Sequence, residues 1–277
     1  MMNSKEDQKV SAVGGQRSTV NGGLSWLPNA FTLLNLVFGC MAIVYLLQNG
    51  IAILDNDEGQ IITLQPEQIY LAPLFIALAA VVDFFDGFVA RLVGASSEMG
   101  KQLDSLADVV SFGVAPSMVI YQLLRLSLAK EENGLDASFL WLAPAFVLAA
   151  AAAYRLAKFN LDTRQTYSFR GTPVPSVGLA VASFPIIYWT SSTEWVLNIL
   201  TNKWFLYAVV AVLSWLMLSD IPIMSNKPKE KNIKSLMPQI VLLVIAVVAA
   251  ILLKWLSVPL IFICFVGLSL LFQKQIR

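Results

Sequence analysis

Residues 81–116 read VVDFFDGFVARLVGASSEMGKQLDSLADVVSFGVAP, and this stretch decides the fold class of the whole chain. Two of its aspartates, Asp83 and Asp86, stand at the end of a long apolar run, and Asp104 and Asp108 stand at the start of the next. An aspartate in a membrane-spanning segment costs about 2.5–3.5 kcal/mol on insertion scales. Four of them in two apolar runs therefore indicate a functional site inside a membrane protein.

Each half of this stretch places its aspartates on one face of a predicted helix, together with small residues. The face of the first helix follows the i, i+3, i+4, i+7, i+8, i+11 spacing and contains Asp83, Asp86, Gly87, Ala90, Arg91 and Gly94. The face of the second helix contains Gly100, Asp104, Ala107, Asp108, Ser111 and Ala115. A face meant for packing would carry Leu or Ile, so Gly and Ala beside carboxylates indicate space for a ligand.

The chemistry of the four carboxylates favours a metal and a phosphate as that ligand. Carboxylates gathered in a medium of low dielectric constant need cations to stay ionised. Oxygen-only ligation suits Mg²⁺ or Mn²⁺, and two such ions can hold a phosphate during an in-line displacement. Arg91, on the same face, can neutralise phosphate oxygens with its planar guanidinium. The alternative is a polar contact between helices that pack through small residues.

The spacing of these residues resembles a known signature. Asp83-x-x-Asp86-Gly87-x-x-Ala90-Arg91, followed after eight residues by Gly100-x-x-x-Asp104-x-x-x-Asp108, is similar to the signature of the CDP-alcohol phosphatidyltransferases, with every position filled. The resemblance implies that an alcohol attacks the β-phosphorus of a CDP-linked lipid and that CMP leaves. It also implies a divalent metal, an intramembrane site near the cytoplasmic face and a homodimer.

The same resemblance assigns roles to the signature residues. The expected metal ligands are Asp83, Asp86 and Asp104, with Asp108 also near the metals. Asp108 is the candidate general base, because the chain contains no histidine and acid–base work must fall to carboxylates. The remaining signature positions are expected to make room for the cytidine nucleotide, namely Gly87, Ala90 and Gly100, or to contact its phosphates, namely Arg91.

Composition and the apolar runs predict an all-α, polytopic membrane protein. The 277 residues are 57% hydrophobic and 13% charged, and the mean hydropathy is +0.69. A net charge of +1 gives no basic field for nucleic acid. Runs of about 20 apolar residues predict eight membrane spans, at 29–48, 70–93, 105–128, 138–157, 174–191, 204–220, 238–254 and 256–273.

These spans predict three regions along the chain. Residues 1–25 are polar and rich in Gly and Ser, so we expect a disordered cytoplasmic tail. Residues 26–225 hold the first six spans and the aspartates, and form the expected catalytic core. Residues 226–277 form a cytoplasmic loop and a C-terminal pair of spans that carry no chemical signal.

The distribution of basic residues predicts the orientation in the membrane. Fifteen of the 19 Lys and Arg residues lie on the side that holds both termini and the connection between the two aspartate pairs. The connection at 49–69, on the opposite side, has four acidic residues and no basic one. The positive-inside rule therefore places both termini and the aspartates at the cytoplasmic face of the cell membrane.

The beginning of the first span carries a second group of polar residues. Asn29, Thr32 and Asn35 are spaced at i, i+3 and i+6 and share one broad helix face. Their amides and hydroxyl can reach a nucleotide or the aspartates. The alternative is helix capping by Asn29 together with hydrogen bonds between helices.

Two further segments bear on the acceptor. Arg155, Lys158 and Asn160 end the fourth span on the cytoplasmic side, where the cations can bind a carboxylate, although anchoring at the membrane surface is the usual role of a lone Lys. Residues 111–116, SFGVAP, are expected to break the third span, because Gly and Pro interrupt helices and such breaks are tolerated where they line a cavity.

Four segments narrow the resemblance to family members that use L-serine as acceptor. They are LPNAFTLLNL at 27–36, DSLADVVSFGVAPS at 104–117, RLAKFN at 155–160 and FRGTPVPS at 169–176. Thr172 departs from the expected Gly-Leu-Pro. The resemblance implies transfer of a phosphatidyl group from CDP-diacylglycerol to L-serine, in contact with the lipid bilayer. The alternatives are another acceptor, such as glycerol 3-phosphate, an inositol phosphate or choline, or a membrane transporter that uses the aspartates as an ion site.

Overall fold

The computed structural model describes residues 26–48, 51–56, 59–64, 70–93, 97–131, 138–161, 171–221, 223 and 233–272. The first helices and strands are α1 (Leu27–Gln48), β1 (Ile51–Asn56), β2 (Gly59–Leu64), α2 (Leu71–Val93), α3 (Glu98–Asp108), the π-helical segment η1 (Val109–Val114) and α4 (Ala115–Ala129). The 3₁₀ turns η3 (Phe139–Trp141) and η4 (Ala143–Phe146) lead into α5 (Val147–Leu161). The remaining elements are α6 (Val174–Thr190), α7 (Glu194–Leu200), α8 (Lys203–Leu218), α9 (Ile233–Leu253), the 3₁₀ turn η5 (Lys254–Leu256) and α10 (Ser257–Leu271).

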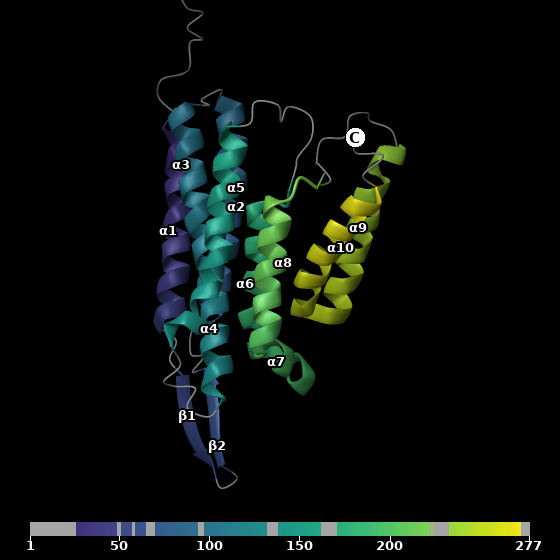
Figure 1. Ribbon diagram of the computed structural model, residues 1–277. Helices are drawn as coiled ribbons and strands as arrows, with labels where there is room; N and C mark the ends of the chain where they lie inside the picture. The colour runs from purple at the N-terminus through teal and green to yellow at the C-terminus, as the bar shows by residue number, and fades with distance from the viewer. Residues whose placement is uncertain are drawn as a thin grey trace, which may run out of the picture.

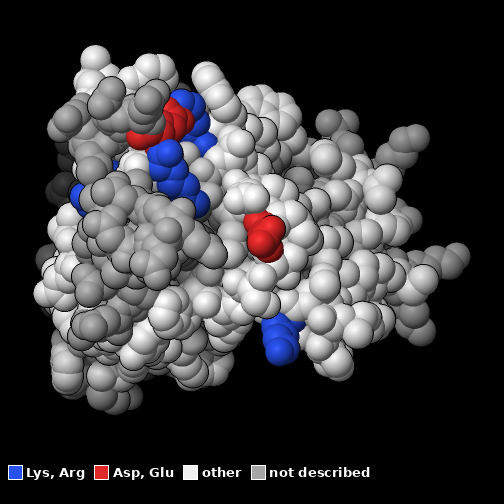
Figure 2. All heavy atoms as spheres, turned by 90° about the horizontal axis from the view of Figure 1, so that it is seen from below, with Lys and Arg blue, Asp and Glu red and all other residues white. Residues whose placement is uncertain are grey.

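The long helices run side by side and give the molecule two distinct ends (Figure 1). The carboxylate end, drawn at the top, holds the junction between α2 and α3. The far end, at the bottom, holds the β1–β2 hairpin, α7 and the turn between α9 and α10. Seen from below, the described residues show one mixed cluster of acidic and basic groups, and a single acidic group and a single basic group lie apart from it (Figure 2).

The helices support a membrane protein, while the number of crossings stays a prediction. Among the described residues, four helical stretches are long and apolar enough to span a bilayer, namely Leu27–Gln48, Leu71–Leu92, Glu98–Ala129 and Met237–Leu271. A fifth is possible if α7 and α8, which meet at a 62° bend, act as one span. Helix α6 is a shorter apolar helix. For the part of the chain that the structure describes, length and composition thus support four or five of the eight predicted spans.

Two local expectations were wrong. The connection at 49–69 is not a plain loop, because β1 and β2 pair in an antiparallel hairpin from Ile51↔Leu64 to Asn56↔Gly59. The predicted break at 111–116 does not occur either, since α3, η1 and α4 form one continuous helical stretch. Pro116 lacks an amide hydrogen and would crowd a carbonyl of an α-helix. The chain widens into π-helix just before it, and the amide of Ala115 bonds Val110 O five residues back.

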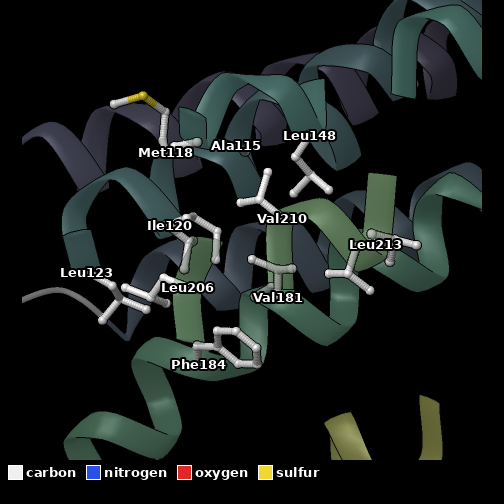
Figure 3. Packing of buried hydrophobic residues seen from close by; sticks show 14 of the residues in the cluster. Ala115, Met118, Ile120, Leu123, Leu148, Val181, Phe184, Leu206, Val210 and Leu213 are labelled. Atoms are coloured by element: carbon white, nitrogen blue, oxygen red, sulfur yellow. The ribbon is translucent and has the colours of Figure 1, made fainter. Parts of the chain in front are cut away.

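The core lies where α4 is surrounded by α5, α6 and α8 (Figure 3). Its labelled side chains are Ala115, Met118, Ile120, Leu123, Leu148, Val181, Phe184, Leu206, Val210 and Leu213. Small residues let the neighbouring helices approach η1 closely. A Cβ added at Gly178 of α6 would lie 3.0 Å from the Cα of Phe112, and one at Gly39 of α1 would overlap Ser111. This close packing fixes the position of the helix that carries Asp104 and Asp108.

Candidate functional site

The structure brings together three of the four predicted aspartates at the carboxylate end. One carboxylate oxygen from each of Asp83, Asp104 and Asp108 lies within 4.8 Å of the other two. Asp83 comes from α2, and the other two stand one turn apart on α3. Asp108 is buried and the other two are half-buried. The two predicted faces therefore meet.

Helix α1 supplies polar partners to the aspartates. Thr32 Oγ1 donates a hydrogen bond to Asp86 Oδ2 at 2.8 Å, and Asn35 Nδ2 donates one to Asp108 Oδ1 at 3.2 Å. Ser111 Oγ donates to the main-chain oxygen of Asn35 at 3.0 Å, which fastens α1 to η1. The polar residues of the first span thus face the aspartates, an arrangement that fits both interpretations of the sequence because these contacts are also hydrogen bonds between helices.

A cavity of about 470 Å³ opens beside Asp86 and Asp104. The residues that line it are Pro28, Asn29, Thr32, Asp86, Gly87, Ala90, Ser97, Glu98, Gly100, Lys101 and Asp104. All three small signature residues are among them, together with Asn29 and Thr32. Arg91 has an exposed side chain and is not part of this lining.

The start of α3 explains why Gly100 is small. Ser97 caps the helix by accepting a hydrogen bond at its Oγ from the Gly100 amide at 2.9 Å. A Cβ at position 100 would lie 3.1 Å from both Ser97 Oγ and Asn29 Oδ1. Gly100 therefore lets the beginning of α1 approach the first turn of α3, and keeps the cavity open between them.

Arg155 lies inside the protein next to the start of α6. Its side chain is 7% exposed, and Nη2 donates to Gly171 O at 3.3 Å. Gly171 has a φ of 76°, and a Cβ there would meet main-chain oxygens of Met217 and Ser219. Arg155 Nε makes no hydrogen bond in the part of the chain that the structure describes, although the atom is buried. The guanidinium therefore has spare donor capacity close to α3.

The other two predicted acceptor residues have separate partners. Lys158 Nζ lies 3.0 Å from Asp220 Oδ1, and both side chains are largely exposed. Asn160 Nδ2 donates to Ser105 Oγ at 2.7 Å, so this residue rests on α3 beside Asp104. Asn160 thus lies against the helix of the aspartates, whereas Lys158 is engaged at the end of α8.

Sequence reasoning missed two of these partners for different reasons. Ser105 follows Asp104 directly and lies off the aspartate face, so helical spacing gave it no role. Asp220 is separated by 62 positions from Lys158, and their pairing depends on α5 packing along α8. The sequence held one usable signal for Asp220, which is an acid just after a long apolar run.

The donor set fits a divalent cation. Three carboxylates from two helices converge within 4.8 Å with oxygen as the only ligand type. Asn35 Oδ1 adds an oxygen that is buried and without a hydrogen-bond partner among the described residues. Such clustering of negative charge in a poorly solvated place is costly unless a cation balances it. The cluster can therefore hold a hard metal ion.

Comparison with known proteins agrees with this site. A family model described as CDP-alcohol phosphatidyltransferase matches residues 25–216. The CDP-diacylglycerol–serine O-phosphatidyltransferase of Bacillus subtilis (strain 168) is 32% identical over 165 residues, which cover 60% of this chain and 78% of the relative. The enzymes of that name from Mycobacterium leprae (strain TN) and Helicobacter pylori (strain ATCC 700392 / 26695) are 33% and 30% identical. Those alignments cover 74% and 75% of this chain, and 60% and 75% of the relatives.

The fold, the aspartate cluster and the family match define the class of protein. The chain belongs to the CDP-alcohol phosphatidyltransferase family. It is therefore a transferase of phospholipid biosynthesis and, with its long apolar helices, an integral membrane protein.

Proposed function

We propose that this enzyme transfers the phosphatidyl group of CDP-diacylglycerol to the hydroxyl of L-serine, which yields phosphatidylserine and CMP. The observation that carries this proposal is the convergence of Asp83, Asp104 and Asp108 beside a cavity lined by the small signature residues. The choice of serine is supported by the names of the relatives and by a buried arginine with spare donor capacity near the cluster.

Asp83, Asp86, Asp104 and Asp108 would hold two divalent cations, Mg²⁺ or Mn²⁺. Bound cations supply positive charge that neutralises phosphate oxygens and makes the phosphorus more electrophilic. The hydrogen bond from Thr32 fixes the direction of the Asp86 carboxylate. The close packing of η1 holds Asp104 and Asp108 on a rigid helix, which suits a site that must keep its geometry.

Asp108 would act as the general base. It takes the proton of the serine hydroxyl while the serine oxygen forms its bond to the β-phosphorus and the bond to the CMP oxygen breaks. The bond from Asn35 Nδ2 to Asp108 Oδ1 fixes one carboxylate oxygen. A modest base is sufficient because the phosphorus is already activated.

The cavity would hold the cytidine nucleotide. Gly87, Ala90 and Gly100 leave its walls without bulky side chains, and Asn29 and Thr32 offer hydrogen bonds. Arg91 would reach the phosphates from outside the cavity lining.

Arg155, Lys158 and Asn160 would bind the serine. A serine zwitterion needs a cation for its carboxylate, and Arg155 has a buried donor without a partner among the described residues. Asn160 stands next to Asp104 through Ser105 and can orient the amine or the carboxylate. Lys158 must leave Asp220 to contribute, so Arg155 is the stronger candidate.

An acceptor panel tests the reaction. Purified protein in lipid is mixed with CDP-diacylglycerol, Mg²⁺ or Mn²⁺, and serine, glycerol 3-phosphate, inositol phosphate or choline, and CMP is measured. Serine should give the fastest CMP release, and excess EDTA should abolish it. Preference for another alcohol would still agree with phosphatidyl transfer as the reaction class, but it would disprove serine as the acceptor. A transporter would release no CMP with any of them.

We further propose that the carboxylate end faces the cytoplasm and that the protein is a homodimer. In a variant without Cys40 and Cys264, Ser97→Cys should resist an impermeant thiol reagent in intact cells, and Glu194→Cys at the far end should react. The reverse labelling pattern would invert the orientation. The mass of the purified protein in a nanodisc measures the number of subunits.

A further inference from the structure

A second cavity, of about 600 Å³, lies between α6, α7, α8 and α10. Every residue that lines it is apolar, and the larger ones include Phe184, Trp195, Phe205, Val209 and Phe262. Its volume is within the range of small-molecule sites, about 300–1,000 Å³. No polar group of the lining can orient a head group or hold water, so the cavity suits a hydrocarbon chain.

This apolar cavity runs along α8 and α10, from Leu216 and Leu270 at one end to the far end of the bundle at the other. Its lining includes Trp195 of α7, Leu256 of η5 and Pro259 at the start of α10. Figure 1 places α7 and the α9–α10 turn at the end opposite the junction of α2 and α3. The chain of a lipid can therefore enter it from the far end.

The far end of the cavity also carries a basic residue. Lys254, two positions before Leu256, has an exposed side chain and makes no ion pair with the described residues. Trp255, the next residue, and Trp195 of the cavity lining both have exposed side chains. Lysine and tryptophan at the end of membrane helices are typical of the lipid head-group level. A phosphate at this level would lie beside Lys254 while its chain occupies the cavity.

We propose that the apolar cavity binds one acyl chain of an anionic phospholipid from the leaflet at the far end, with Lys254 beside the lipid phosphate. Because the cavity lies between membrane helices, acyl chains are the material available to fill it. The lipid is a resident molecule of the bilayer. The lipid joins the C-terminal pair α9–α10 to the core. The protein's own contact between the two parts is mainly the packing of α10 and η5 on α6.

Gly267 offers a way to fill the cavity. It belongs to the lining, and a Cβ there would meet no atom within 4 Å, so a larger side chain enters open space. Gly267→Phe therefore competes with the acyl chain. Ala250→Phe is the matched control, because it adds a similar ring to an exposed position of α9 outside the lining. Ala208→Phe fills the same cavity from α8 and serves if the first variant does not fold.

The test counts bound lipid by native mass spectrometry after the full chain is moved from nanodiscs of phosphatidylglycerol and phosphatidylcholine into detergent. The wild type and Ala250→Phe should keep one phosphatidylglycerol, and Gly267→Phe should lose it. Lys254→Gln should lower the ratio of bound phosphatidylglycerol to phosphatidylcholine about fivefold, and Lys254→Arg should preserve it. CMP release should change less than twofold in Gly267→Phe.

Three results would overturn the proposal. Retention of the lipid by both filling variants would mean that the cavity holds none. Loss of a dimer in Gly267→Phe without loss of lipid would make the cavity a contact between two copies of the chain. If Gly267→Phe raised the apparent Michaelis constant for CDP-diacylglycerol and left the number of bound lipids unchanged, the cavity would instead hold the acyl chain of the substrate.

Discussion

The helical stretch Glu98–Ala129 and the pair within Met237–Leu271 are both long and apolar, yet they are used differently. About 72% of the apolar part of the first is buried inside the protein, against 11% of the second. The first carries two aspartates among its small and apolar residues, whereas the second has no acidic residue and is apolar over most of its surface. Small and polar residues in a membrane helix therefore mark the sides that meet protein or ligand.

The difference follows from what each residue type can do in hydrocarbon. A buried carboxylate must find a partner, so Asp108 fixes which helices surround it, and Asn35 of α1 is one of them. A leucine in the same position could make equally favourable contacts with lipid tails or with other apolar side chains. The first stretch consequently defines a site, and the second leaves a cavity that lipid can fill.

The largest predicted effect comes from a substitution in the first stretch, which carries the aspartates. Asp108→Asn should lower CMP release by about 10²–10⁴-fold, because the amide cannot accept the serine proton. Asn35 can still bond the new side chain, so the fold should be retained. The rate of CMP release measures the effect, with Glu194→Gln, an exposed acid on α7, as the control. A loss of less than tenfold would remove Asp108 as the general base.

The next prediction ranks the two basic residues of α5. A charge-assisted hydrogen bond contributes about 1.5–3 kcal/mol. Arg155→Gln should therefore raise the apparent Michaelis constant for serine by about ten- to over a hundredfold. Lys158→Gln should change it less than about fivefold, since an exposed pair such as Lys158–Asp220 contributes about 0.2–1 kcal/mol.

Initial-rate kinetics in both substrates separate the roles of these residues. The apparent Michaelis constant for CDP-diacylglycerol should stay within about threefold of the wild type in both variants, because neither residue lines the cavity proposed for the nucleotide. An equal rise in the two substrate constants for Arg155→Gln would indicate that Arg155 holds the fold of the site and does not bind serine. A larger effect from Lys158→Gln would reverse the ranking.

The helices and the meeting of the two aspartate faces could be predicted from sequence, because helical spacing and the cost of buried charge act locally. The contact of Asn35 with Asp108 could be stated only as one of two possibilities, since it joins residues 73 positions apart. The hairpin of β1 and β2 was missed because the acidic connection was judged by its charge. The π-helical segment was missed because Pro116 was expected to end the helix, whereas the wider turn accommodates it.

The placement of α9 and α10 lay beyond prediction for a different reason. Their residues are apolar all round, so no periodic face shows which neighbour they meet. The sequence likewise does not show which neighbours surround Arg155. Its place at the end of an apolar run suggests an anchor at the membrane surface, but in the structure it is buried and bonds Gly171, which packs against the end of α8.

The smallest predicted effect compares one glycine in each region. Gly178 faces η1, where an added Cβ would lie 3.0 Å from both Cα and Cβ of Phe112, and Gly267 faces the open apolar cavity. Replacing either by Ala favours the helix by up to about 1 kcal/mol. Because this gain is common to both variants, the difference between them isolates packing. Overpacking costs about 1–3 kcal/mol, so Gly178→Ala should be less stable than Gly267→Ala by that amount.

Thermal unfolding in one detergent measures this difference. For a chain of this size, 1 kcal/mol corresponds to about 2–4 °C, so the two midpoints should differ by about 2–12 °C, with Gly178→Ala lower. Backbone contacts leave Phe112 no inexpensive way to retreat, because η1 also meets α1 at Gly39 and α5 at Ala152. Equal midpoints would show that α6 can shift away from η1, and that the packing around the aspartate helix is no tighter than the packing of the C-terminal pair.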